Sequence, residues 1–153
     1  MALTYRALAL LLTYPTADIQ TAAPAIMAAI RSEGLVPPPI VSALDKLARK
    51  LEHEDLYELQ EGFVHLFDRT RSLSLNLYEH IHGESRDRGQ AMAALIELYG
   101  SYGLELTANE LPDHLPVFLD FLSTLPDEDA ASLLGEGAHV LAALAERLHK
   151  RES

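Results

Sequence analysis

The densest group of chemically active side chains lies between His80 and Gln90. It contains two imidazoles, two carboxylates and two guanidinium groups: His80, His82, Glu84, Arg86, Asp87 and Arg88. Imidazole nitrogen and carboxylate oxygen are common zinc ligands, and three protein ligands are enough for a catalytic zinc ion. One hypothesis is therefore a metal site formed by His80, His82 and Glu84, which would make the protein a metal-dependent helical hydrolase.

The spacing of the two histidines argues against shared metal binding. If residues 76–82 form a helix, His80 and His82 lie on different sides of it, because helical side chains meet at separations of three or four residues. The alternatives are a structural hydrogen bond between a helix end and a neighbouring loop, or contact with a partner. We therefore predict no metal site here.

Acid–base catalysis is the second chemistry that this segment suggests. Glu84 and Asp87 are two neighbouring carboxylates, but Arg86 and Arg88 lie beside them and would form ion pairs with them. The chain has no cysteine nucleophile and no phosphate-binding loop, dinucleotide glycine pattern or His-Glu-x-x-His motif. We therefore predict that the protein is not an enzyme and holds no cofactor stably.

The charge of the chain points to the kind of partner. The net charge is −11, and no Lys or Arg occurs between Arg88 and Arg147. Binding to nucleic acid requires Lys and Arg against the phosphates, so nucleic acid is disfavoured and a basic partner is favoured. The alternative to a basic partner is that these acidic residues simply form a solvated surface. No apolar run approaches the roughly 20 residues of a membrane span, and nothing resembles an export signal, so we expect a cytoplasmic protein.

Apolar side chains beside this polar segment suggest a peptide-binding surface. Leu66, Phe67 and Tyr78 are candidates for a groove that takes the apolar face of an amphipathic helix. The alternative is that they belong to the ordinary core. Arg69 and Arg71 follow directly and are either solvated, paired with a neighbouring carboxylate, or in contact with the partner.

The elements that position these side chains are predicted to be helices. Apolar residues recur at helical spacing between Pro and Gly interruptions, which predicts an all-α fold, a single-domain irregular helical bundle over 1–153. The expected helices are 4–13, 18–31, 40–51, 56–66, 76–82, one that follows Ser85, one that follows Asp113, and 129–150, with an irregular loop over 68–75.

The ends of these helices carry recognisable signals. Asp18, Ser85 and Asp113 are predicted N-caps, because their side chains accept hydrogen bonds from free backbone N–H groups. Gly34 stands where a helix commonly ends in left-handed geometry. The three prolines 37–39 are expected to form a stiff connector.

Two blocks of sequence resemble a known family. The first block is 66–75, Leu-Phe-Asp-Arg-Thr-Arg-Ser-Leu-Ser-Leu, followed by 78–92, which begins Tyr-Glu-His-Ile-His-Gly-Glu-Ser; it is similar to the NarJ group of redox-enzyme maturation chaperones. The second block, 110–122, also resembles that group and keeps Pro112, Asp113 and His114 of the Glu-Pro-x-Asp-His pattern of the broader chaperone family. Leu111 separates Glu110 from Pro112, a departure that points to the nitrate reductase branch.

The resemblance implies a function. Such a chaperone binds the N-terminal leader of the apo catalytic (alpha) subunit of nitrate reductase and keeps that subunit ready for insertion of the molybdenum cofactor. The resemblance also makes proteins that deliver the molybdenum cofactor candidate partners. Chaperones of related molybdoenzymes, namely hydrocarbon dehydrogenase and selenate or chlorate reductase, are the alternative. The residues expected to contact the client are Leu66, Phe67, Asp68, Arg69, Arg71, Tyr78, Glu79, His82, Glu84, Arg86, Asp87, Arg88, Gln90, Asp113 and His114.

Overall fold

The computed structural model describes residues 1–82, 85–107 and 110–151, and these residues form helices and connecting segments without a β-strand. The all-α prediction is therefore confirmed. The helices are α1 (Leu3–Leu11), α2 (Ala17–Glu33), α3 (Pro38–His53), α4 (Leu56–Phe63), the π-helix η1 (Val64–Asp68), the 3₁₀-helix η2 (Arg71–Leu73), α5 (Leu77–Ile81), α6 (Arg86–Ser101), α7 (Leu115–Leu122), α8 (Asp127–Glu136) and α9 (Ala138–Arg151).

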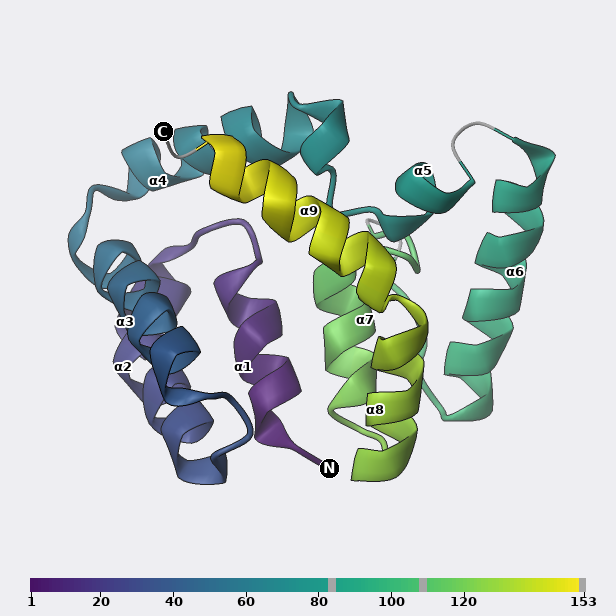
Figure 1. Ribbon diagram of the computed structural model, residues 1–153, viewed down its shortest axis with the longest axis horizontal. Coiled ribbons are helices and arrows are strands. Elements are labelled where there is room, and N and C mark those ends of the chain that lie inside the picture. Colours follow the sequence, from purple (N-terminus) through teal and green to yellow (C-terminus); the bar gives the residue numbers. More distant parts are fainter. Residues whose placement is uncertain (83–84, 108–109, 152–153) are drawn as a thin grey trace.

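Helix α1 lies at the centre of the bundle, between the α2–α3 pair and α7 (Figure 1). Its side chains enter two apolar cores. Ala7 and Leu11 join the core made by α2, α3 and Leu59, and Ala9 joins the core made by α7, α8, α9 and Tyr99. Alternate faces of one short helix therefore connect the two halves of the molecule, because burial of each face removes apolar surface from water.

The second helix begins and ends for local reasons. The Thr16 side chain accepts a 3.2 Å hydrogen bond from the backbone N–H of Ile19, so Thr16 is the N-cap and the prediction for Asp18 was wrong. Gly34 ends the helix at a φ of 65°, as its position predicted. Pro38 and Pro39 open α3 rather than forming part of a separate connector, because the first turn of a helix needs no N–H from them.

The predicted helix 56–66 changes type part-way. It is α-helical to Phe63 and continues as η1, in which Arg69 N–H donates to the Val64 carbonyl at 2.9 Å. The segment 68–75, expected to be irregular, contains the short helix η2. Asn76 then forms an isolated antiparallel β-bridge with His114.

The predicted helix 129–150 is in fact two helices, α8 and α9, that meet at Gly137. The apolar spacing continues through both, but the backbone turns at the glycine, which has little helix propensity. After this turn α9 runs across the bundle toward α4 (Figure 1). Val140 and Leu144 are buried on its inner face.

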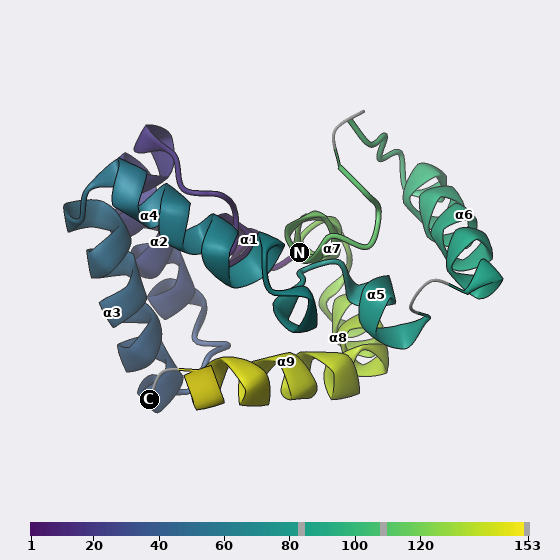
Figure 2. The same cartoon turned by 90° about the horizontal axis from the view of Figure 1, so that it is seen from above.

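Helix α6 stands to one side of the bundle in both views (Figures 1 and 2). All of its residues are described, and of these only Tyr99 is buried. Ser85 is at the N-cap position without a hydrogen bond from its side chain. At the start of α7 the N-cap is His114, and the prediction for Asp113 was wrong, because its carboxylate points to another element.

Candidate functional site

The two family-like sequence blocks meet in the structure. Leu115 N–H donates to the Leu75 carbonyl at 2.8 Å, and Leu77 N–H donates to the Asp113 carbonyl at 3.1 Å. These bonds flank the bridge between Asn76 and His114. Residues far apart in sequence therefore form one rigid junction between α5 and α7.

Asp113 is the buried centre of this junction. Its side chain is 1% exposed, and Oδ2 accepts a 2.8 Å hydrogen bond from the backbone N–H of Tyr78. Oδ1 has no hydrogen-bond partner among the described residues. Burial raises the pKa of Asp113, while the bond from Tyr78 and the charge of Arg88 act in the opposite direction.

Tyr99, the buried residue of α6, supports the same junction and was not among the predicted site residues. Its hydroxyl donates to the Pro112 carbonyl at 2.6 Å, and its ring lies 4.6 Å from that of Phe121. Burial is the main reason that the pKa of Tyr99 is raised. Its position just before glycine in a predicted helix gave no indication of this bond.

The two histidines of the polar segment engage different groups. Nε2 of His80 lies 2.8 Å from the Ser74 carbonyl, which can only accept, so Nδ1 is left to accept from Arg147 at 3.4 Å. The ring of His82 lies 5.3 Å from that of Tyr78. Glu84, the third group of the metal hypothesis, lies outside the described residues. Within the described ranges no three His, Asp or Glu side chains gather as a metal site.

His114 and the remaining predicted residues lie around this junction or beyond it. His114 is half-buried, and burial lowers its pKa. Glu79 and Arg88 are half-buried beside Asp113, whereas Asp68, Arg69, Arg71, Arg86, Asp87 and Gln90 are exposed. The charged residues at the start of α6 thus form a surface beside the junction.

Leu66 and Phe67 lie on a second surface, an apolar groove of about 490 Å³. Its walls come from α1, α3, α4, η1 and α9. The apolar lining includes Leu47, Leu51, Leu59, Phe63, Leu66, Phe67 and Leu148. Tyr78, predicted to share a groove with Leu66 and Phe67, is not among the lining residues. The structure therefore separates the predicted site into a groove and a junction.

Charged side chains of both signs line the groove. The carboxylates are Glu54 and Glu58, and the cations are Lys50 and Arg151. A neighbouring hollow of about 370 Å³ is lined by Glu58, Glu61, Gly62, His65 and Arg69. Glu58 and Gly62 line both, so the groove and this hollow adjoin each other.

Several groove residues lie on apolar helix stripes that neighbouring helices cover only in part. Leu47 belongs to the apolar stripe of α3 but is 37% exposed in the groove, and Leu148 is half-buried. The π-helical geometry of η1 also sets the directions of Leu66 and Phe67, and such turns occur frequently at functional sites. One sequence feature indicates such a groove: a helix that carries more apolar residues on one face than a single neighbouring helix can cover.

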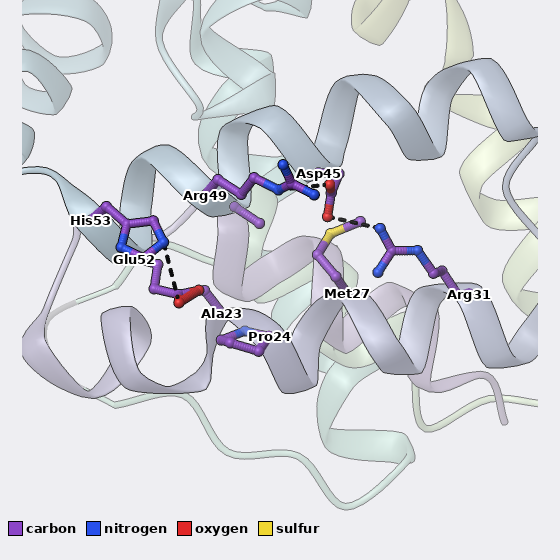
Figure 3. A pocket seen from close by; sticks show the side chains of 9 residues that line it. Ala23, Pro24, Met27, Arg31, Asp45, Arg49, Glu52 and His53 are labelled. Carbon is purple, nitrogen blue, oxygen red and sulfur yellow. Dashed lines mark hydrogen bonds and ion pairs between the residues drawn. The ribbon is translucent and has the colours of Figure 1, made fainter.

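A third hollow lies between α2 and α3 (Figure 3) and has a volume of about 440 Å³. Its charged side chains pair with one another: Asp45 contacts Arg31 at 2.8 Å and Arg49 at 3.0 Å. Its floor is Ala23, Met27 and Ala48. None of the predicted site residues lies there, so the groove and the junction remain the candidates.

Comparison with known proteins shows the family of this chain. The family model described as nitrate reductase delta subunit matches residues 34–153, which include α3 to α9. The chain belongs to the nitrate reductase delta subunit family. Most of the groove and all of the junction lie within the matched residues.

Individual members of the delta subunit family extend the match. The chain is 43% identical over 143 residues to the nitrate reductase molybdenum cofactor assembly chaperone NarJ of Escherichia coli strain K12, covering 94% of this chain and 61% of that protein. It is 46% identical over 110 residues to the probable chaperone NarW of the same strain, covering 72% and 48%. The probable NarJ of Bacillus subtilis is 30% identical over 154 residues, covering 99% and 81%. The chain thus spans about three-fifths or less of the length of the E. coli relatives.

Proposed function

We propose that this protein is an assembly chaperone of nitrate reductase, which binds the apo catalytic subunit through its N-terminal leader and supports insertion of the molybdenum cofactor. Membership of the delta subunit family supports the class of function. The relatives named as molybdenum cofactor assembly chaperones support the client. The protein acts on a cofactor-containing client without being an enzyme or keeping a cofactor itself.

The apolar groove is the observation that carries this proposal. Leu47, Phe63 and Leu66 line this hollow of about 490 Å³, so part of their apolar surface is not covered by other residues of the chain. A helical segment binds such a groove through apolar residues on one face, with charges at the rim. A leader that has yet to be incorporated into its enzyme is a segment of this kind, because its apolar face has no partner of its own.

The junction is proposed as the second contact with the client. The polar residues around it include Arg86, Asp87 and Gln90, which are exposed on the first two turns of α6. Asp113 is too buried to contact a client directly and holds α5 and α7 in position. We assign His114 and Tyr78 to the same supporting role at the edge of that surface.

The structure is compatible with action in the cytoplasm, where the apo catalytic subunit is made. No helix in the described part of the chain is long and apolar enough to cross a bilayer. Association with a membrane would then come through the client. Proteins that deliver the cofactor are proposed as transient partners of the same complex.

Deletion of the gene tests the function. We expect the catalytic subunit to accumulate without molybdenum in nitrate-respiring cells, and the wild-type gene to restore the metal, measured by mass spectrometry of the purified subunit. A pull-down with the full chain should recover that subunit from the deletion strain. A fully metallated client in the deletion strain, or recovery of a different molybdoenzyme alone, contradicts the proposal.

A further inference from the structure

Gly62 separates the apolar groove from the neighbouring hollow and lines both of them. It lies in the last turn of α4, just before the π-helix η1. Glu58, one turn earlier, also lines both spaces. At Gly62 the boundary between the two spaces is therefore formed by helix backbone without a side chain.

Nothing inside the chain explains a glycine at this position. A Cβ atom built on Gly62 would meet no atom within 4 Å, so alanine would fit without a clash. Glycine within a helix costs about 1 kcal/mol relative to alanine. Because Gly62 also lines two adjoining hollows, the missing side chain there suits a close approach by another molecule.

The charges of the second hollow select the group that would enter it. Glu58 and Glu61 contribute two carboxylates, and Arg69 contributes one guanidinium. Nε2 of His65 already faces Arg151 at 3.3 Å. In the described residues no ion pair within 4.0 Å joins Arg69 to either glutamate. An added cation gains from both carboxylates, whereas an added anion is repelled by them.

We propose that the groove and this hollow form one two-part site, in which the apolar face of the client's leader helix occupies the groove and a lysine or arginine of that helix crosses over Gly62 to Glu58 and Glu61. This inference rests on the proposed function and adds the chemistry by which the leader is recognised. It requires an occupant with a basic residue about one helical turn from its apolar anchors.

Two cations that line the groove bear on the orientation of the occupant. Lys50 and Arg151 line the groove but not the second hollow. A basic flank directed toward these two cations is disfavoured, and the same flank directed toward Glu58 and Glu61 is favoured. These charges therefore favour an orientation in which the basic residue of the helix lies near Glu58 and Glu61.

Substitutions at Gly62 provide the sharpest test. The probe is a fluorescent synthetic peptide that copies the leader of the organism's nitrate reductase catalytic subunit, titrated with the full chain. Gly62→Leu should weaken its binding about tenfold, because the side chain obstructs the passage. Gly62→Ala should bind more weakly than wild type while raising Tm by about 2–4 °C, because alanine favours the helix.

Gly135→Ala is the matched control. Gly135 is also a helical glycine whose Cβ would meet nothing within 4 Å, but it lies in α8 and lines neither space. It should raise Tm and leave peptide binding unchanged. Unchanged binding of the peptide by Gly62→Leu, with wild-type folding, overturns the two-part site.

A double-mutant cycle tests the cation directly. The Glu58→Gln, Glu61→Gln variant should bind the natural peptide about threefold to tenfold more weakly. Against a peptide in which the crossing Lys or Arg is replaced by Gln, the same variant should show no further loss. Equal losses with both peptides contradict the charge contact. A peptide that fails to bind wild type at all contradicts the proposed function instead, so the two failures are distinguishable.

Discussion

The carboxylate of Asp113 accepts a hydrogen bond from the backbone N–H of Tyr78 across 35 residues of sequence, at 2.8 Å. The bond joins the start of α5 to the segment that precedes α7. Because both sequence blocks shared with the NarJ group converge on it, we expect Asp113 to act through the position of its neighbours rather than by touching a client.

Two substitutions of Asp113 should have opposite effects. Asp113→Ala removes the acceptor for Tyr78 N–H and should lower the free energy of unfolding by about 1–3 kcal/mol, measured by urea titration at pH 7. Asp113→Asn keeps an acceptor and removes a buried charge, so it should retain wild-type stability or exceed it. Destabilisation of Asp113→Asn equal to that of Asp113→Ala would show that the negative charge itself is required.

The pH dependence of the same pair follows from the raised pKa of Asp113. The folded state holds the proton more tightly than the unfolded state, so this residue's contribution is most favourable below its unfolded pKa. It declines as the pH rises through the folded value. Asp113→Asn should therefore gain stability over wild type on going from about pH 4 to pH 7. A constant difference between the two proteins across this range contradicts the assignment.

Glu33 should give a pH effect of opposite sign. Its carboxylate accepts from the backbone N–H of Leu3 at 2.7 Å and from both the N–H and the hydroxyl of Thr4, thereby capping α1. The Thr4 bond is the largest of the causes that lower the pKa of Glu33. This stability is present above the unfolded pKa and is lost as the pH falls through the folded value.

Glu33→Gln measures that contribution. It should lower Tm at pH 7 and converge with wild type near pH 3, measured by thermal unfolding. Glu128→Gln, an exposed change in the first turn of α8, serves as the comparison for loss of a surface charge. A Glu33→Gln deficit that persists unchanged at pH 3 would assign the effect to packing rather than to the cap.

Tyr99→Phe isolates one buried hydrogen bond. The change removes the hydroxyl that donates to the Pro112 carbonyl and keeps the ring against Phe121. The expected cost is about 1–3 kcal/mol in the free energy of unfolding, because a buried carbonyl loses its donor. Urea titration of Tyr102→Phe provides the comparison, since Tyr102 is 52% exposed. Equal stability of Tyr99→Phe and wild type would mean that the bond contributes nothing.

Leu66→Glu should separate groove binding from folding. Leu66 lines the groove without belonging to either apolar core, so a charge there should lower affinity for the leader peptide at least about tenfold with little change in helix content. Circular dichroism and fluorescence titration measure the two quantities. Tyr57→Glu, at a 79% exposed position of α4 outside the groove, should leave both unchanged. Wild-type affinity in Leu66→Glu removes the groove as the binding surface.

Helical periodicity predicted the fold class and most helix positions, because amphipathic stripes reflect local geometry. It failed where tertiary contacts decide. Asp113 carries the residue type of an N-cap, yet its carboxylate satisfies Tyr78 instead, and the turn at Gly137 interrupts a stripe that continues on both sides. The partner of Asp113 and the turn at Gly137 both depend on how helices pack against one another, which local spacing does not encode.

The candidate site was harder to predict than the fold. The resemblance pointed to residues between Leu66 and Leu122, but a groove built from α1, α3, α4 and α9 has no signature in any one of these helices. The junction could not be predicted from the sequence either, because its hydrogen bonds join Leu75 and Leu77 to Leu115 and Asp113, which are far away along the chain. Leu66 and Tyr78 are close in sequence, and only the structure shows that they serve different surfaces.

The π-helical turn over Val64–Asp68 gives the groove a means of changing shape through chain length. A π turn accommodates one residue more than an α turn, and the helix before it keeps its direction. Loss of one residue there would rotate Leu66 and Phe67 relative to Phe63 by about 100° while leaving α1, α3 and α9 in place. Members of the family could thus adapt to different leaders by a single insertion or deletion, with no change in the core.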